Sequence, residues 1–225
     1  MNATRRTAYV SVTCAAAVVA TVAVIVHAQQ DGGGPAGEPV PYGAPAVVVM
    51  NQPPSATRLE SMLAARGTVI VRGFTDVGTV QAEDGSGVSV TAVELSDPTR
   101  GQREFGLAVG VRQGGRVPLS VLTYVDADEL ESLAAALDFL GRMDGTVTQL
   151  TGYEGRFKSK GDLEVANFAD DGTRMVAVKG MQVLPENGQV IYASAYFPLS
   201  RLADVKQLVA TGRQIITKAR GEDNH

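Results

Sequence analysis

The sequence predicts an α+β fold made of two pseudo-repeats, each an antiparallel β-meander followed by an amphipathic helix, sharing one core. The first observation is an internal repeat, because residues 117–140 align with residues 189–212 when the sequence is shifted by 72 positions. In both copies, period-two alternation of apolar residues gives way to helical spacing, which marks a strand leading into a helix. The second observation is that helices follow runs of strands instead of alternating with them, which favours antiparallel sheet. A unit of about 70 residues is marginal alone, so we expect the two copies to share their core.

The N-terminal 28 residues predict a signal peptide. Arg5 and Arg6 precede an uncharged apolar run over residues 8–26, and small residues stand before a cleavage site after Ala28. The apolar run is just long enough to span a membrane, which takes about 20 residues, so an uncleaved N-terminal anchor is the alternative. In both cases we expect the rest of the chain to be exported, to the periplasm or the exterior of a bacterial cell.

The composition changes twice more along the chain. Residues 29–54 contain six of the prolines and predict a flexible Pro/Gly-rich spacer that cannot bury enough surface to fold. Within it, the AVVV run at residues 46–49 is either a short strand for a sheet edge or an apolar patch. Residues 55–222 form the predicted globular domain, with the internal duplication at about 78–144 and 147–220.

The first half of this domain begins with a helix over residues 55–66, capped by Ser55 or Thr57 and ended by Gly67. Strands are predicted over residues 68–75, 79–83, 88–95, 104–112 and 117–125. Asp126 and Glu129 then form the capping-box pattern of a second helix. Its buried stripe is Leu130, Leu133, Leu137 and Leu140, and Gly141 ends it.

The second half repeats this order. Strands are predicted over residues 149–158, 162–168, 174–184 and 189–197. The Asp170-Asp171-Gly172 and Glu186-Asn187-Gly188 sequences are typical of hairpin turns. Ser200 is the predicted cap of the last helix, which buries residues of the same apolar spacing: Leu202, Val205, Leu208, Val209 and Ile216.

The composition excludes several kinds of chemistry. Cys14 and His27 lie in the leader and His225 is the last residue, so the body of the domain holds no cysteine or histidine. Triad catalysis, thiol redox chemistry and zinc sites with His or Cys ligands need those residues. We therefore expect no enzyme activity, no metal site and no cofactor. The formal charge of −4 becomes about −6 without Arg5 and Arg6, which disfavours nucleic acid as a partner.

Arg156, Lys158 and Lys160 are the candidate ligand-binding residues. At period two they share one face of a strand, and three cations in a row suit a phosphate, a sulfate or an acidic glycan. The alternative is a solvated or charge-protected edge strand, in which Asp162 and Glu164 pair with the cations. The acidic residues at 126, 128, 129 and 131 lack the spacing of a calcium loop and suit helix capping instead.

Tyr124 and Tyr196 occupy equivalent positions in the two copies. They could form a paired ligand platform, but we expect them to pack where each strand meets its helix.

Three functions remain in order of preference. The first is a non-enzymatic exported module that binds an envelope protein or an anionic polymer through its sheet. The second is single-stranded nucleic-acid binding. Here the chain resembles, in topology only and without a shared motif, the duplicated Whirly and PUR-type binders. Few aromatic residues and the negative charge oppose it. The third is a histidine-free hydrolase that uses two facing carboxylates.

Overall fold

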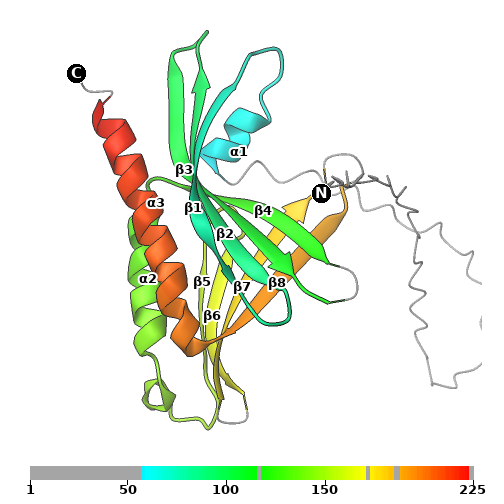
Figure 1. Ribbon diagram of the computed structural model, residues 1–225, viewed down its shortest axis with the longest axis vertical. Coiled ribbons are helices and arrows are strands. Elements are labelled where there is room, and N and C mark those ends of the chain that lie inside the picture. The colour runs from blue at the N-terminus through cyan, green and yellow to red at the C-terminus, as the bar shows by residue number, and fades with distance from the viewer. Residues whose placement is uncertain (1–56, 116–117, 171–172, 185–187, 223–225) are drawn as a thin grey trace, which may run out of the picture. The chain divides into compact units, whose positions relative to one another are not determined.

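The domain contains two antiparallel sheets. The computed structural model describes residues 57–115, 118–170, 173–184 and 188–222, and the expected leader, spacer and Ser55 cap lie outside these ranges. Sheet A has the order β1 (Val71–Gln81), β2 (Gly87–Asp97), β3 (Gln102–Gln113) and β4 (Leu119–Asp126) (Figure 1). Sheet B has the order β5 (Glu154–Lys158), β6 (Glu164–Asp170), β7 (Thr173–Val183) and β8 (Val190–Pro198). The predicted α+β class with two repeated meanders is therefore confirmed.

Each meander is followed by a helix that covers the other sheet. Helix α2 (Leu130–Arg142) follows sheet A but contacts β5 and β6 of sheet B. Helix α3 (Leu202–Glu222) follows sheet B, after a 3-10 turn at Leu199–Arg201, but contacts β1, β2 and β3 of sheet A. The two helices also pack against each other and run side by side (Figure 1). The long helix of each half therefore covers the apolar face of the other half's sheet.

A single core joins these elements. Its buried side chains come from both sheets and both long helices, and they form one continuous apolar cluster. At its centre, a small void is lined by Val88, Val90, Val109, Leu133, Leu137, Leu163, Val165, Val178, Val205 and Val209. The sheets approach closely here because β7 carries Gly180, where a Cβ atom would lie 3.1 Å from side-chain carbons of Val121 and Thr123 in β4. The predicted sharing of one core is confirmed.

A second, smaller core lies on the opposite face of sheet A. Helix α1 (Arg58–Leu63) places Leu59 and Met62 against Val93, Leu95 and Ala108. Figure 1 shows α1 on the side of the sheet away from α3. In the described residues, sheet B has no corresponding helix on its outer face.

The predicted capping box of α2 is wrong. This helix begins at Leu130, its N-cap residue is Glu129, and it has no side-chain capping bond. Asp126 instead caps α1, where its carboxylate accepts hydrogen bonds from the amides of Arg58, at 2.8 Å, and Leu59, at 3.2 Å. The local sequence pattern suits capping of α2. The Asp126 carboxylate instead binds the amides of α1, which lies far from it in the sequence.

Three of the predicted strands also differ from the structure. Residues 68–75 and 79–83, expected as separate strands, belong largely to the single strand β1, whose pairing with β2 shifts register between Asp76 and Gly78. This bulge uses Gly78 at φ 151°, a conformation that only glycine adopts easily. Residues 149–153 are not strand, because a 3-10 turn at Gly145–Val147 and irregular chain precede β5.

Candidate functional site

Arg156 and Lys158, two of the predicted site residues, lie on the outer face of β5 with acidic partners. Arg156 Nη2 is 2.7 Å from Glu154 Oε1 and its Nη1 is 3.5 Å from Glu164 Oε2. Lys158 Nζ is 2.6 Å from Asp162 Oδ1. The hydrogen bond with Glu154, together with the charge of Glu164, raises the pKa of Arg156, and the hydrogen bond with Asp162 raises the pKa of Lys158. Both cations stay charged, and both are neutralised within the chain.

Lys160, the third predicted site residue, lies in the turn after β5 and points to a different part of the molecule. Its amide donates to Glu129 Oε1 at 2.9 Å and its Nζ lies 3.4 Å from Asp128 Oδ2. It therefore joins the β5–β6 turn to the start of α2. The structure does not place Lys160 in one row with Arg156 and Lys158.

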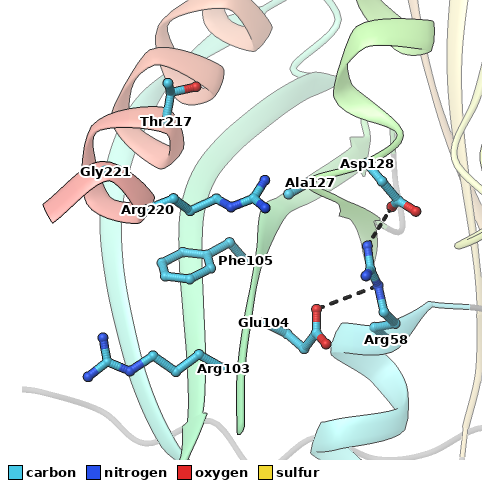
Figure 2. Close-up of a pocket in the computed structure, with 9 residues that line it drawn as sticks. All are labelled: Arg58, Arg103, Glu104, Phe105, Ala127, Asp128, Thr217, Arg220 and Gly221. Atoms are coloured by element: carbon cyan, nitrogen blue, oxygen red, sulfur yellow. Dashed lines mark ion pairs between the residues drawn. The ribbon is translucent and has the colours of Figure 1, made fainter. Parts of the chain in front are cut away.

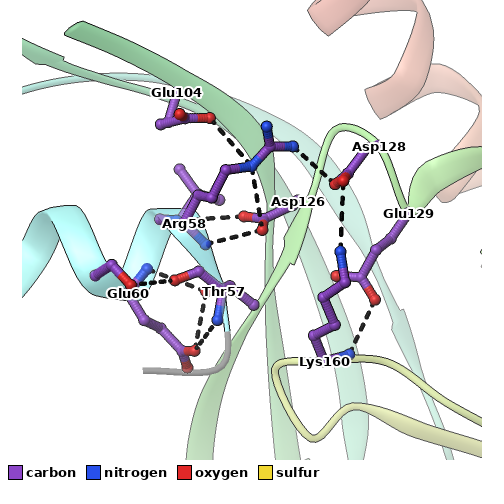
Figure 3. A network of polar contacts seen from close by, with 10 residues as sticks. Thr57, Arg58, Glu60, Glu104, Asp126, Asp128, Glu129 and Lys160 are labelled. Carbon is purple, nitrogen blue, oxygen red and sulfur yellow. Dashed lines mark hydrogen bonds and ion pairs between the residues drawn. The ribbon is translucent and has the colours of Figure 1, made fainter. Parts of the chain in front are cut away.

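Asp126, Asp128 and Glu129, just before α2, belong to a network around the start of α1 (Figure 3). Arg58 is its centre, with Nη2 2.9 Å from Asp128 and Nε 3.5 Å from Glu104 and 3.7 Å from Asp126. Partial burial lowers the pKa of Arg58, but the charges of Glu104 and Asp128 outweigh it, so the net shift is upward. The network holds α1 on sheet A and joins three carboxylates to one guanidinium.

An open pocket of about 660 Å³ lies beside this network (Figure 2). Its walls come from α1, β3, the turn between β4 and α2, and the end of α3. The charged lining residues are Arg58, Arg103, Arg220, Glu104 and Asp128. Arg58 is held by Glu104 and Asp128, the two of its carboxylate partners that line the pocket, as the dashed lines in Figure 2 show. Arg103 Nη1 lies 3.7 Å from Glu94. The pocket is polar and nearly balanced in charge, with three cations facing two carboxylates.

The equivalent tyrosines have different surroundings. Tyr124 pairs with Ala108 in sheet A and is partly buried beside the small core under α1. Tyr196 pairs with Ala177 in sheet B and is exposed on the uncovered outer face. The expected packing at the strand end therefore holds for Tyr124 and not for Tyr196, because α1 covers only one of the two sheets. Within the described ranges, no cluster of three or more His, Cys, Asp or Glu side chains could hold a metal ion, and no helix is both long and apolar enough to cross a membrane.

The most distinctive surface of the domain is the free edge of β1. Among the described strands, β1 has one neighbour, β2, so half of its backbone amides and carbonyls face outward. The side chains at positions 71–76 are exposed on both faces of the strand. Val71 is 52% and Phe74 is 65% exposed, and Val69, just before the strand, is 66% exposed. An open apolar strand edge of this length is a template for pairing with another strand.

An apolar pocket of about 250 Å³ lies beside this edge. Its walls are Gly73, Phe74 and Thr75 of β1, the adjacent part of β2, Phe105 of β3, and three residues of α3: Ile215, Ile216 and Ala219. It extends the apolar surface from the edge of β1 onto α3.

The other three terminal strands are protected. β4 and β8 each contact strands of the opposite sheet, and the Leu122 amide of β4 even donates to Gln182 Oε1 at 3.4 Å. β5 is only five residues long and carries Glu154, Arg156 and Lys158 on its outer face. Short length and charge are the usual means by which proteins keep an edge from pairing. Two of the three cations that stood out in the sequence thus protect one edge, whereas among the described strands β1 has no such protection.

The sequence carries a weak signal for the β1 edge, which the expectations from the sequence missed. Residues 71–76 combine two large apolar side chains with only two charges, and they precede a glycine suited to a bulge. The sequence does not show whether this strand lies at the edge or in the middle of its sheet, and the same residues in a central strand would not indicate a binding surface.

Searches against models of known protein families, against curated proteins and against solved structures each found no match to this chain.

Proposed function

We propose that this protein is an exported, non-enzymatic interaction module that binds a protein partner by adding a strand to the free edge of β1. The observation that carries the proposal is the exposure of residues 71–76 on both faces of a terminal strand. Backbone groups at such an edge supply affinity, and pockets for alternate side chains supply specificity. The apolar pocket between β1 and α3 is suited to the second role.

Export and the absence of catalysis are parts of the same proposal. The basic start, apolar run and small residues before position 29 support export. The lack of cysteine and histidine in the body of the domain, and the pairing of Asp126, Asp128 and Glu104 with Arg58, support a role in binding rather than turnover. A polymer ligand at Arg156 and Lys158 is less well supported, because both cations have carboxylate partners.

Site-specific photo-crosslinking in intact cells tests the proposal. A photoreactive phenylalanine analogue replaces Phe74 on the β1 edge, and a matched variant carries it at Phe139, a residue of α2 with similar exposure at 58%. We expect a discrete cross-linked product from position 74, recovered with the cell envelope and identified by mass, and none from position 139. No product at 74, or the same products from both positions, would contradict the proposal.

A further inference from the structure

We infer that the β1 edge pairs with the β1 edge of a second copy of this chain, in antiparallel register centred on Phe74. The inference rests on the proposed function and names its partner. Two such edges would join two four-stranded sheets into one continuous sheet across a two-fold axis. A self-complementary patch of this kind is what a symmetric dimer requires.

The register follows from symmetry and charge. In an antiparallel strand pair related by a two-fold axis, facing side chains lie on the same side of the sheet only when one residue faces its own copy across the axis. We call this the residue on the axis. With Phe74 on the axis, Arg72 faces Asp76 of the second copy, and Asp76 faces Arg72 of the second copy. The two Phe74 rings face each other between these ion pairs. Aromatic pairs and opposite charges are favourable neighbours across antiparallel strands.

The other symmetric registers of this segment are poorer. An axis through Arg72 or Asp76 places two like charges opposite each other, which destabilises a strand pair. An axis through Gly73 or Thr75 places one charged residue opposite Phe74 and forms no pair of opposite charges. Only the register centred on Phe74 uses the whole segment from Val71 to Val77 and matches both charges.

The two charged residues are available for such a contact. Arg72 lies over the Phe74 ring, with its guanidinium carbon 5.5 Å from the ring centroid. Asp76 accepts a hydrogen bond from the Thr91 hydroxyl at 3.1 Å. Among the described residues, neither has an ion pair within the chain, unlike Arg156 and Lys158 on the protected edge of β5. Both Arg72 and Asp76 are exposed.

The bulge sets the end of the paired segment. The register of β1 with β2 shifts between Asp76 and Gly78, and a bulge bends the strand and interrupts its ladder. Residues beyond Val77 therefore turn away from the line of the edge, toward α3, where a Cβ atom at Gly78 would meet Leu208. The open part of the edge coincides with the segment that is self-complementary.

Charge reversal tests the inference. Sedimentation velocity over a wide range of concentration is measured for the purified chain with its native N-terminal processing, and for Arg72→Asp, Asp76→Arg and the double variant. We expect a concentration-dependent dimer for the unaltered chain. Each single reversal creates two like-charge contacts and should weaken the dimer by about tenfold or more. The double reversal should restore the dimer, because it exchanges the two charges.

Mixing the two single variants gives the sharpest result. Arg72→Asp chains and Asp76→Arg chains should each be largely monomeric alone, because a dimer of either variant places like charges opposite each other at both positions. Mixed together they should form a heterodimer, because every acidic residue of one chain then faces a basic residue of the other. A general loss of folding cannot produce this rescue. The inference fails if the unaltered chain stays monomeric, or if its dimer is insensitive to both reversals. It also fails if Phe74 cross-links only to a different protein, an outcome that would leave the proposed interaction role intact.

Discussion

Asp126 shows how one side chain positions an entire element. The residue is 2% exposed, and its carboxylate accepts two amide hydrogen bonds at the start of α1 and lies near the Arg58 guanidinium. α1 has only six residues, too few to be stable as an isolated helix. Thr57 and Glu60 add a capping box at the same end. The helix therefore depends on its cap and on the apolar contacts of Leu59 and Met62.

Replacing Asp126 by alanine should reduce the free energy of unfolding by about 2 kcal/mol, because the amides of Arg58 and Leu59 lose their acceptor and α1 loses one of its caps. The matched control is Asp128→Ala, which removes a half-exposed carboxylate from two ion pairs and should cost less than about 1 kcal/mol. Urea unfolding of both variants measures the difference. Equal effects of the two substitutions would show that Asp126 acts only as another surface charge.

The apolar stripes of the two long helices meet in one place. Leu133 and Leu137 of α2 and Val205 and Val209 of α3 meet around the same small void, together with valines of both sheets. Each stripe was visible as helical spacing in the sequence. That spacing shows which face of a helix is buried, but it contains no information about which sheet the face contacts.

Leu137→Ala should destabilise the domain by about 2–5 kcal/mol, the usual range for leucine truncation in a packed core. The comparison is Phe139→Ala, two residues further along α2, which removes an exposed ring and should change stability by no more than about 0.5 kcal/mol. Denaturant unfolding followed by circular dichroism provides both values. A small effect at Leu137 would contradict the central position assigned to it.

The two meanders are structurally one folding unit. Sheet A is covered by α3, which the chain reaches only after completing sheet B, and sheet B is covered by α2 from the first half. Most core contacts of the long helices are therefore non-local in sequence, and neither half can bury its own sheet with its own helix. This arrangement predicts a single cooperative unfolding transition.

Separating the halves tests this directly. When the chain is cut between Thr148 and Gln149, in the segment between α2 and β5, each fragment alone should lack cooperative thermal unfolding. Mixing the fragments should restore the circular dichroism spectrum and the transition of the uncut domain. A fragment that folds and melts cooperatively by itself would contradict the shared core.

Several features followed from the sequence alone because they depend on local periodicity. The change from period two to helical spacing at residues 117–140 and 189–212 located β4 with α2 and β8 with α3, and the turn residues separated the strands of each meander. The sequence also allowed the alternative interpretation of Arg156 and Lys158, as cations paired with Glu164 and Asp162 on an edge strand. Pairs of residues only four and eight positions apart determine it.

Only the tertiary structure decided which partner each of these surfaces meets. It assigned the Asp126 carboxylate to α1 instead of α2, exchanged the long helices between the sheets, and covered Tyr124 while leaving Tyr196 exposed. Among the described strands, it also left β1 with an open edge. The physical reason is the same in each case: propensity and periodicity act over a few residues. The cap of α1, the helix that covers each sheet and the exposure of a strand edge depend on contacts between residues tens of positions apart. A single sequence does not show which of these distant residues come into contact.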